Sequence, residues 1–182
     1  MENIIQAKKL TKVYGEKETS VTALDNIDVQ FNENEFTAIM GPSGSGKSTL
    51  LHCLAGLDRP TSGQILLKDQ DISTLNDKQL TKIRRDSFGF VFQAFNLIPT
   101  LTAEENITLP ASISGRKPDM DWIKQVVQTV DISDRLTHRP NELSGGQQQR
   151  VAAARAMATK PEVIFADEPS GNLDSKSSKE LL

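Results

Sequence analysis

Residues 36–49 read Phe36-Thr37-Ala38-Ile39-Met40-Gly41-Pro42-Ser43-Gly44-Ser45-Gly46-Lys47-Ser48-Thr49, an apolar run followed by a loop rich in glycine. The last nine residues begin with the pattern GxxxxGK(S/T), from Gly41 to Ser48, of a phosphate-binding loop, which follows a strand and opens a helix. Glycines let such a loop curl so that successive N–H groups point at phosphate oxygens. Lys47 can then reach the β- and γ-phosphates of a nucleotide, and the Ser48 hydroxyl can ligate magnesium. The stretch therefore predicts a nucleotide site, against the alternative of a turn that is only rich in Gly and Ser.

A second segment with paired glycines reads Leu143-Ser144-Gly145-Gly146-Gln147 and leads into the alanine-rich stretch Gln147 to Ala158, which we expect to be helical. Ser144 offers a hydroxyl, and the two glycines leave backbone N–H groups unobstructed where the helix begins. A helix start of this kind binds anions. We therefore expect this segment to form half of a phosphate site whose other half is the Gly41 loop.

A third motif is a short apolar run that ends in two carboxylates, Pro161-Glu162-Val163-Ile164-Phe165-Ala166-Asp167-Glu168. It predicts a buried strand. Asp167 suits an outer-shell contact to magnesium, and Glu168, which points elsewhere as the strand ends, suits a base for an attacking water. Alone, the segment would be read as an ordinary pair of surface carboxylates, so its meaning depends on the other motifs.

Three apolar runs, Phe36 to Met40, Phe88 to Phe92 and Val163 to Ala166, are typical of buried parallel strands. Each is followed directly by a candidate functional residue, as expected where ligands sit at the carboxyl ends of an open α/β sheet. We therefore expect Gln93 and Asp167 to lie near the Gly41 loop.

The rest of the chain divides into a β part and a helical part. Alternating apolar residues in Ile4 to Val13 and Leu24 to Phe31 predict antiparallel strands joined by the polar turn Gly15 to Ser20. Between Gln93 and Leu143 the pattern becomes helical, and Thr102-Ala103-Glu104-Glu105 fits a capping box. One apolar helical face comprises Trp122, Ile123, Val126, Val127 and Val130.

Trp122 is expected to belong to the core of this helical part and not to stack on a nucleotide. Ser114 to Pro118 is expected to form a loop. The predicted fold class is α/β: a P-loop NTPase core with a mainly parallel sheet, an antiparallel β-subdomain and a helical subdomain at about residues 95–150, all within a single domain over 1–182.

Composition limits the function classes. A chain of 182 residues with 37% hydrophobic content can bury a core as one domain, and its net charge of −3 argues against a broad nucleic-acid-binding face. The single cysteine, Cys53, excludes an internal disulfide and fits a reducing compartment. We find no signal peptide and no apolar run near the ~20 residues that span a bilayer. If cargo crosses a membrane, another polypeptide or a missing segment must form the path.

Taken together, the Gly41 loop, the Leu143 segment and the strand ending at Asp167-Glu168 occur in the order and spacing of the ATP-binding-cassette (ABC) ATPase family. The chain resembles this family from end to end. Further matches are Tyr14, where the family stacks an aromatic ring on adenine, Gln93, and Ser170-Gly171-Asn172-Leu173-Asp174, where it has its D-loop.

Within the family, two stretches resemble the bacterial subgroup that serves macrolide, lipoprotein-release and antimicrobial-peptide transporters. They read Leu57-Asp58-Arg59-Pro60-Thr61-Ser62-Gly63 and Gly89-Phe90-Val91-Phe92-Gln93-Ala94-Phe95-Asn96-Leu97-Ile98-Pro99. Phe95, Leu97 and Ile98 either shape a groove for a membrane partner or pack inside the helical subdomain.

The resemblance implies a mechanism. Two copies pack head to tail, each ATP is held between the Gly41 loop of one copy and Ser144 to Gln147 of the other, and an integral membrane permease docks nearby. The protein would then be cytoplasmic and peripheral on the inner face of the cell membrane. The implied ATP contacts are Tyr14, Gly41, Pro42, Ser43, Gly44, Ser45, Gly46, Lys47, Ser48, Thr49, Gln93, Ser144, Gly145, Gly146, Gln147 and Asp174; the implied Mg²⁺ ligands are Ser48, Gln93 and Asp167; the implied residues of hydrolysis are Glu168, Lys47 and Gln93.

One departure from the family concerns a histidine that it places on a further strand after the D-loop, where it touches the γ-phosphate. This sequence stops at Leu182, eight residues past Asp174, and neither His52 nor His138 matches that position. We therefore expect a truncated chain that binds nucleotide with impaired turnover. Restoring a C-terminal segment without any gain in turnover would contradict this expectation.

Two further function classes stay open at this point. A soluble ABC ATPase that acts on ribosomes or DNA would usually carry a tandem second cassette, a long coiled-coil insertion or zinc-binding cysteines, none of which is visible. A P-loop kinase or GTPase would leave the Leu143 segment unexplained, and a preference for GTP over ATP would mark it.

Overall fold

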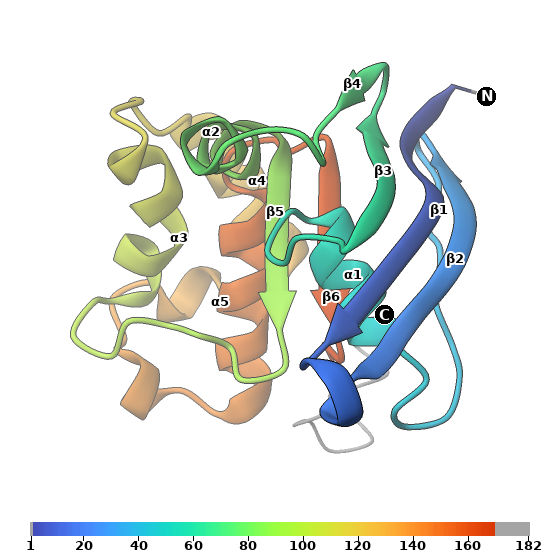
Figure 1. Ribbon diagram of the computed structural model, residues 1–182. Helices are drawn as coiled ribbons and strands as arrows, with labels where there is room; N and C mark the ends of the chain where they lie inside the picture. Colours follow the sequence, from blue (N-terminus) through green and yellow to red (C-terminus); the bar gives the residue numbers. More distant parts are fainter. Residues whose placement is uncertain (1, 170–182) are drawn as a thin grey trace. The chain divides into compact units, whose positions relative to one another are not determined.

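The computed structural model describes residues 2–169 (Figure 1). The chain divides into two compact units, Met1–Arg84 and Arg85–Leu182. The first contains an antiparallel sheet and a helix that follows the glycine-rich loop, and the second contains a small parallel sheet with helices. The predicted combination of antiparallel, parallel and helical parts is confirmed.

The sheet of the first unit has the strand order β2-β1-β3-β4, and every pair in it is antiparallel. The strands are β1 (Asn3–Tyr14), β2 (Val21–Asn32), β3 (Ser62–Leu67) and β4 (Gln70–Asp71), and a short 3-10 turn, Lys17–Thr19, connects the first two. The predicted pair β1 and β2 is confirmed. The sequence pattern did not predict β3, which covers the other edge of β1, or β4.

A β-bulge in β1 changes which of its side chains point into the core. Ile5 and Ala7 are buried, so strict alternation would next turn Lys9 into the core. The pairing register shifts between Ala7 and Leu10, and Lys9 takes a φ of 48°. The extra residue lets Leu10 point inward, where it is fully buried, while Lys9 stays exposed.

Two helices complete this part of the chain. Helix α1 (Lys47–Leu54) lies against β1 and β2 and buries Cys53 and Leu54. Helix α2 (Asp77–Ser87) begins in the first unit and buries Leu80. A side chain at Gly56, just after α1, would approach Leu80, so this turn needs a small residue.

The run Phe36 to Met40 is not the buried parallel strand that its composition predicts. Its backbone is irregular, and Phe36 and Met40 are 84% and 88% exposed. A strand forms only when a neighbour satisfies its backbone N–H and C=O groups. Within residues 2–169 the run pairs with no strand, so apolar character alone was not sufficient to place it in a sheet.

The other two predicted strands do form a parallel pair. β5 (Phe88–Phe92) pairs in register with β6 (Val163–Asp167), so that Phe92 lies opposite Asp167. The rings of Phe88 and Phe165 meet edge to face with centroids 5.1 Å apart. Gly89 has no room for a side chain because a Cβ there would collide with the carbonyl of Ala156, so this glycine lets α5 approach β5 closely.

The helices of the second unit enclose an apolar cluster. They are α3 (Ala103–Ile113), α4 (Met120–Thr129) and α5 (Gly145–Met157), with short 3-10 turns at Ser133–Arg135 and Pro140–Glu142. The predicted capping box is present: Thr102 and Glu105 each bond the other's backbone N–H. The cluster comprises Ala103, Ile107, Ile123, Val126, Val127, Ile132, Leu143, Val151, Ala154 and Ala158.

Trp122 packs against this cluster, and its indole Nε1 donates to the Met157 carbonyl at 2.8 Å. Both contacts favour the core interpretation of this residue. Residues 114–118 form the connection from α3 to α4, as predicted. In the part of the chain from 2 to 169, every helix is too short or too polar to cross a membrane.

Candidate functional site

The glycine-rich loop turns into α1 through two residues in the left-handed region. Gly44 has a φ of 78° and Gly46, which caps α1, has a φ of 87°. The Lys47 ammonium donates to the carbonyls of Gly41 at 3.0 Å and Pro42 at 2.8 Å. The lysine therefore reaches back across the loop, and its charge lies beside the first backbone groups of the loop.

The start of α1 has the properties of an anion site. Its first turn carries Lys47 and no acidic residue. The first N–H groups of a helix have no partner within it and carry the positive end of the helix dipole. The loop therefore combines backbone donors and one ammonium group, the set that binds a polyphosphate.

Gly46→Ala is expected to lower the free energy of unfolding by about 2–4 kcal/mol. The alanine would have to adopt a left-handed backbone conformation, and its Cβ would also clash with a neighbouring group. A Cβ at Gly46 would lie 2.5 Å from the Ala23 carbonyl oxygen. Gly44→Ala is the matched control, since Gly44 has a similar φ and nothing within 4 Å. We expect about 1 kcal/mol there by urea denaturation. Equal losses would contradict the steric argument.

Tyr14 lies at the end of β1 with 41% of its surface exposed. Its hydroxyl donates to Asp58 Oδ2 at 2.6 Å, and the Lys12 ammonium lies 4.7 Å from its ring centroid. Thr49, in the first turn of α1, is one of the groups that influence the pKa of Tyr14, so the two side chains lie near each other. The exposed part of Tyr14 is open to a ligand, and its role as an adenine contact stays a prediction.

The Leu143 segment begins α5 with a reciprocal cap. Ser144 Oγ accepts from the Gln147 N–H at 3.3 Å, and Gln147 Oε1 accepts from the Ser144 N–H at 2.9 Å. Leu143 is buried in the helical cluster and anchors the segment. The cap fixes where α5 begins, so Gly145 and Gly146 provide the first backbone donors of the helix, as predicted.

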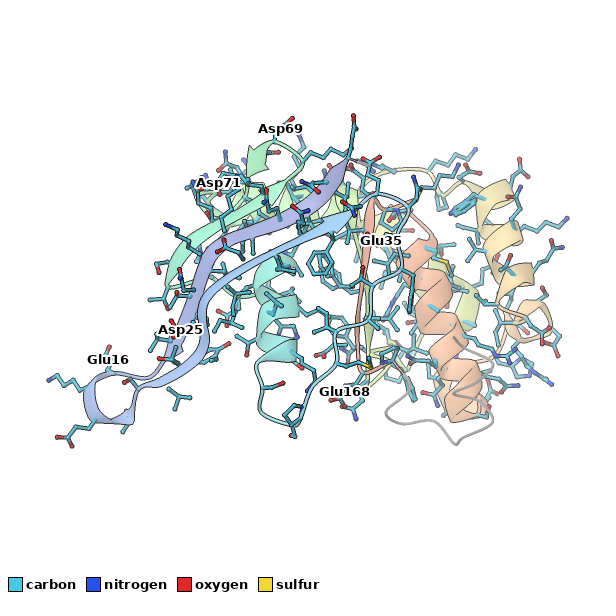
Figure 2. The ribbon with its side chains drawn as sticks, turned by 90° about the vertical axis from the view of Figure 1, so that its right-hand side faces the viewer. Glu16, Asp25, Glu35, Asp69, Asp71 and Glu168 are labelled. Atoms are coloured by element: carbon cyan, nitrogen blue, oxygen red, sulfur yellow. The ribbon has the colours of Figure 1, made fainter. Side chains whose placement is uncertain are left out.

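The carboxyl ends of β5 and β6 bring three candidate residues to one edge. Phe92 pairs with Asp167, and Gln93 and Glu168 are the first residues after the carboxyl ends of the two paired strands. Glu168 has a φ of 47°, which turns the chain at the end of β6 (Figure 2). Gln93 and Glu168 are exposed, and Asp167 is half-buried.

Gln149 is fully buried in α5, and its Nε2 donates to the Pro169 carbonyl at 2.5 Å. This bond joins the helix that follows the Leu143 segment to the residue directly after Glu168. The sequence did not predict this bond, because a buried polar residue cannot be recognised in an alanine-rich helical pattern that carries three consecutive glutamines.

The loop after Gln93 is held from the same helix. The Arg155 guanidinium donates to the carbonyls of Asn96 at 2.5 Å and Phe95 at 2.8 Å, and both of these residues have positive φ values. Burial lowers the pKa of Arg155 from its ordinary value. Leu97 packs against the helical cluster, whereas Ile98 is 39% exposed. Leu97 thus packs inside the helical part, and a groove for a membrane partner at Ile98 stays a prediction.

The oxygen ligands that magnesium prefers are available at the β5 and β6 edge, where Gln93 and Asp167 offer an amide and a carboxylate oxygen. Ser48, in the first turn of α1, is the third predicted ligand. Residues 2–169 contain no group of three or more His, Cys, Asp and Glu side chains arranged to hold a metal ion. Such a site would therefore depend on phosphate oxygens and water to complete its ligands.

The structure thus brings together Tyr14 and the loop in the first unit, and Gln93, Asp167 and Glu168 in the second. That Gln93 and Asp167 lie near the Gly41 loop stays a prediction, because they belong to different units. The predicted D-loop, including Asp174, lies outside the described residues. Lys12 and Asp58, which contact Tyr14, were not predicted as site residues.

The family profile described as "ABC transporter" matches residues 24–171. This chain belongs to the ABC transporter family. It is an ABC ATPase domain, with its glycine-rich loop, Leu143 segment and β6 carboxylates in the order that the resemblance implied. An uncharacterized ABC transporter ATP-binding protein of Thermotoga maritima is 47% identical over all of this chain and 79% of its own length.

Two named relatives come from the subgroup that the sequence resembles. The lipoprotein-releasing system ATP-binding protein LolD of Cytophaga hutchinsonii is 46% identical over 100% of this chain and 82% of its own length. The macrolide export ATP-binding/permease protein MacB of Marinobacter nauticus is 47% identical over 98% of this chain, but this covers 28% of that protein. The chain is thus homologous to ATP-binding subunits and domains of transporters.

A solved structure of the ABC transporter cassette MJ0796, described as dimeric, superposes with a TM-score of 0.87. It is 45% identical over 97% of this chain and 79% of its own. A second dimeric structure of MJ0796, in a post-hydrolysis state with ADP and Pi, gives the same TM-score at 44% identity and the same coverage. These similarities establish the fold and the ATPase family of the chain.

Proposed function

We propose that this ABC ATPase binds and hydrolyses ATP to power a membrane transporter. The observation that carries the proposal is the Gly41 loop, where Lys47 lies beside the carbonyls of Gly41 and Pro42 at the start of α1. The name of the MacB relative, which joins an ATP-binding part to a permease, supports the link to transport. Binding energy of ATP would drive a conformational change in the transporter, and hydrolysis would reverse it.

In this account the base of ATP stacks on Tyr14, and its phosphates lie along the loop from Gly41 to Thr49. Lys47 neutralises charge on the β- and γ-phosphates. Glu168 accepts a proton from the attacking water, or orients it, for in-line attack on the γ-phosphorus. Gln93 contacts the water or the metal ion at the same edge as Glu168.

Ser48, Gln93 and Asp167 would hold Mg²⁺, Asp167 through an intervening water. A bound Mg²⁺ supplies charge neutralisation at the β- and γ-phosphates. The hydroxyl, amide and carboxylate oxygens of these residues fit a hard cation. Asp174 is proposed as a further contact of the nucleotide, although it lies outside the described residues.

We further propose that each ATP is shared by two copies of the chain. The Gly41 loop of one copy would face Ser144 to Gln147 of the other. The dimeric structures of MJ0796 support the formation of a dimer. The rate of Mg-ATP hydrolysis per molecule should then rise with protein concentration until dimers saturate. A rate per molecule that is independent of concentration from nanomolar to micromolar would contradict a shared site.

The partner would be an integral membrane permease, which places this protein at the cytoplasmic face of the membrane. Affinity purification from detergent-solubilised membranes should recover an integral membrane protein in stoichiometric amount. Recovery of ribosomes or DNA in its place would favour the alternative, a soluble ABC ATPase that acts on these assemblies. The acidic balance of the chain favours the permease.

Gln149→Leu should lower kcat for ATP hydrolysis by roughly 10-fold or more and leave KM nearly unchanged. The substitution removes the bond to the Pro169 carbonyl, so the turn that carries Glu168 loses a fixed point, and small displacements of a catalytic group are costly. Gln125→Leu, on the exposed face of α4, is the matched control. Equal kcat values for the two variants would show that the bond does not position Glu168.

A further inference from the structure

A three-residue cluster surrounds Tyr14 in the first unit. Asp58 accepts from Tyr14 at 2.6 Å through Oδ2 and from the Lys12 ammonium at 2.6 Å through Oδ1. Lys12 also donates to the Arg59 carbonyl at 2.8 Å. One carboxylate thus joins two side chains of β1 to the segment that follows α1.

The contacts within the cluster set the protonation states of Asp58 and Tyr14. Burial opposes ionisation of Asp58, but the hydrogen bonds from Lys12 and Tyr14 outweigh it and hold the pKa of this carboxyl below its ordinary value. The hydrogen bond to Asp58 and partial burial raise the pKa of Tyr14. Asp58 is therefore ionised and Tyr14 is a neutral donor at neutral pH, which makes their bond charge-assisted and short.

The cluster does not cover Tyr14 completely. Lys12 and Tyr14 are two residues apart on β1 and project to the same side. The Lys12 ammonium lies over the ring at 4.7 Å from its centroid, yet 41% of Tyr14 remains exposed. A planar base therefore has access to ring surface that the ammonium does not cover.

The same bonds relate the ring to the phosphate loop. Asp58 follows α1 by four residues. Asp58 N–H and Leu57 N–H both donate to the His52 carbonyl, which ties this segment to the helix. The hydroxyl of Tyr14 is thus bonded to the segment that follows the helix whose start carries Lys47.

We propose that Asp58 is a positioning residue that locks the Tyr14 ring in the orientation for stacking on the nucleotide base. A ring on two rotatable bonds would otherwise lose side-chain entropy when the base binds, and the carboxylate removes part of that cost in advance. Lys12 neutralises Asp58, so the carboxylate does not repel the phosphates of the ligand. The inference rests on the proposed role of Tyr14 as the base platform.

The test compares ATP with inorganic tripolyphosphate, which has the phosphates but no base. Dissociation constants are measured by calorimetry at fixed Mg²⁺ for Tyr14→Ala, Tyr14→Phe, Asp58→Ala and the double variant Tyr14→Phe/Asp58→Ala. Asp69→Ala is the matched control, because Asp69 is exposed in the turn between β3 and β4 (Figure 2). Tyr14→Phe keeps the ring and removes only the hydrogen bond to Asp58. This variant therefore still tests the proposal if Asp58→Ala folds poorly.

We expect Tyr14→Ala to weaken ATP binding by about 10-fold, in line with the loss of a base–aromatic stack, and to leave tripolyphosphate unchanged. Tyr14→Phe and Asp58→Ala should each weaken ATP by about 5-fold, and the double variant should be no weaker than either, because all three lack the same bond. The control should bind both ligands like the parent chain.

Two outcomes would overturn the role of Asp58 and keep the base platform: ATP affinity within 2-fold of the parent in Tyr14→Phe and Asp58→Ala, or an equal loss for ATP and tripolyphosphate in Asp58→Ala. The second would show that Asp58 supports the loop and not the ring. If Tyr14→Ala itself leaves ATP binding unchanged, the proposed function of Tyr14 fails, and the inference about Asp58 fails with it.

Discussion

Glu168→Gln is expected to lower kcat for ATP hydrolysis by about 10²–10⁴-fold while ATP binding persists. Gln has nearly the same shape as Glu but cannot accept the proton of the attacking water. Glu168 follows the end of β6 in a left-handed turn, and Gln93 follows β5, the parallel partner of β6. Its effect should therefore be confined to the chemical step, measured as phosphate release under single-turnover conditions.

The control for this substitution is Glu104→Gln, which makes the same chemical change on an exposed residue in the first turn of α3. We expect hydrolysis at the parent rate. If Glu168→Gln retains more than about a tenth of the parent rate, the carboxylate is not the base, and the assignment of the β6 edge as the centre of the reaction is wrong.

Lys47→Ala should weaken ATP binding by about 100-fold, equivalent to about 3 kcal/mol. The substitution removes an ammonium group that would make charge-assisted bonds to two phosphate groups, each worth about 1.5–3 kcal/mol. In the structure this ammonium donates to the carbonyls of Gly41 and Pro42, the first two residues of the loop. Titration with a fluorescent ATP analogue measures the change.

Lys82→Ala, on the exposed surface of α2, removes the same charge from the same unit without touching the loop. The comparison distinguishes a specific contact of Lys47 with ATP from a general electrostatic attraction of ATP to the protein. Similar losses for Lys47→Ala and Lys82→Ala would mean that net charge, and not the loop, attracts the nucleotide.

The parts of the site that could be predicted are those fixed by neighbours in sequence. Gly46 caps α1 because a left-handed residue is needed where the loop enters the helix, and Ser144 and Gln147 form their cap across three residues. The order of these motifs also identified the family correctly. Such features depend on backbone geometry within one turn, so a short pattern contains the necessary information.

The parts that could not be predicted depend on distant partners. Phe36 to Met40 has the composition of a strand, but pairing decides whether a strand forms. β3 was missed because Ser62–Leu67 is short and half polar, and it is defined by its register with β1. Asp58 lies 44 residues from Tyr14, and Gln149 lies 20 residues from Pro169, so no local pattern indicated either contact.

If two copies of this chain complete each ATP site, ATP should drive dimer formation. Sedimentation velocity of Glu168→Gln, with and without Mg-ATP, measures this, because the variant is expected to bind ATP without consuming it. We predict a shift from the 20.0 kDa monomer to a species of about twice that mass, and no shift for the same variant carrying Ser144→Arg. A species that binds ATP and remains at 20.0 kDa at tens of micromolar protein would show that the ATP sites are not shared.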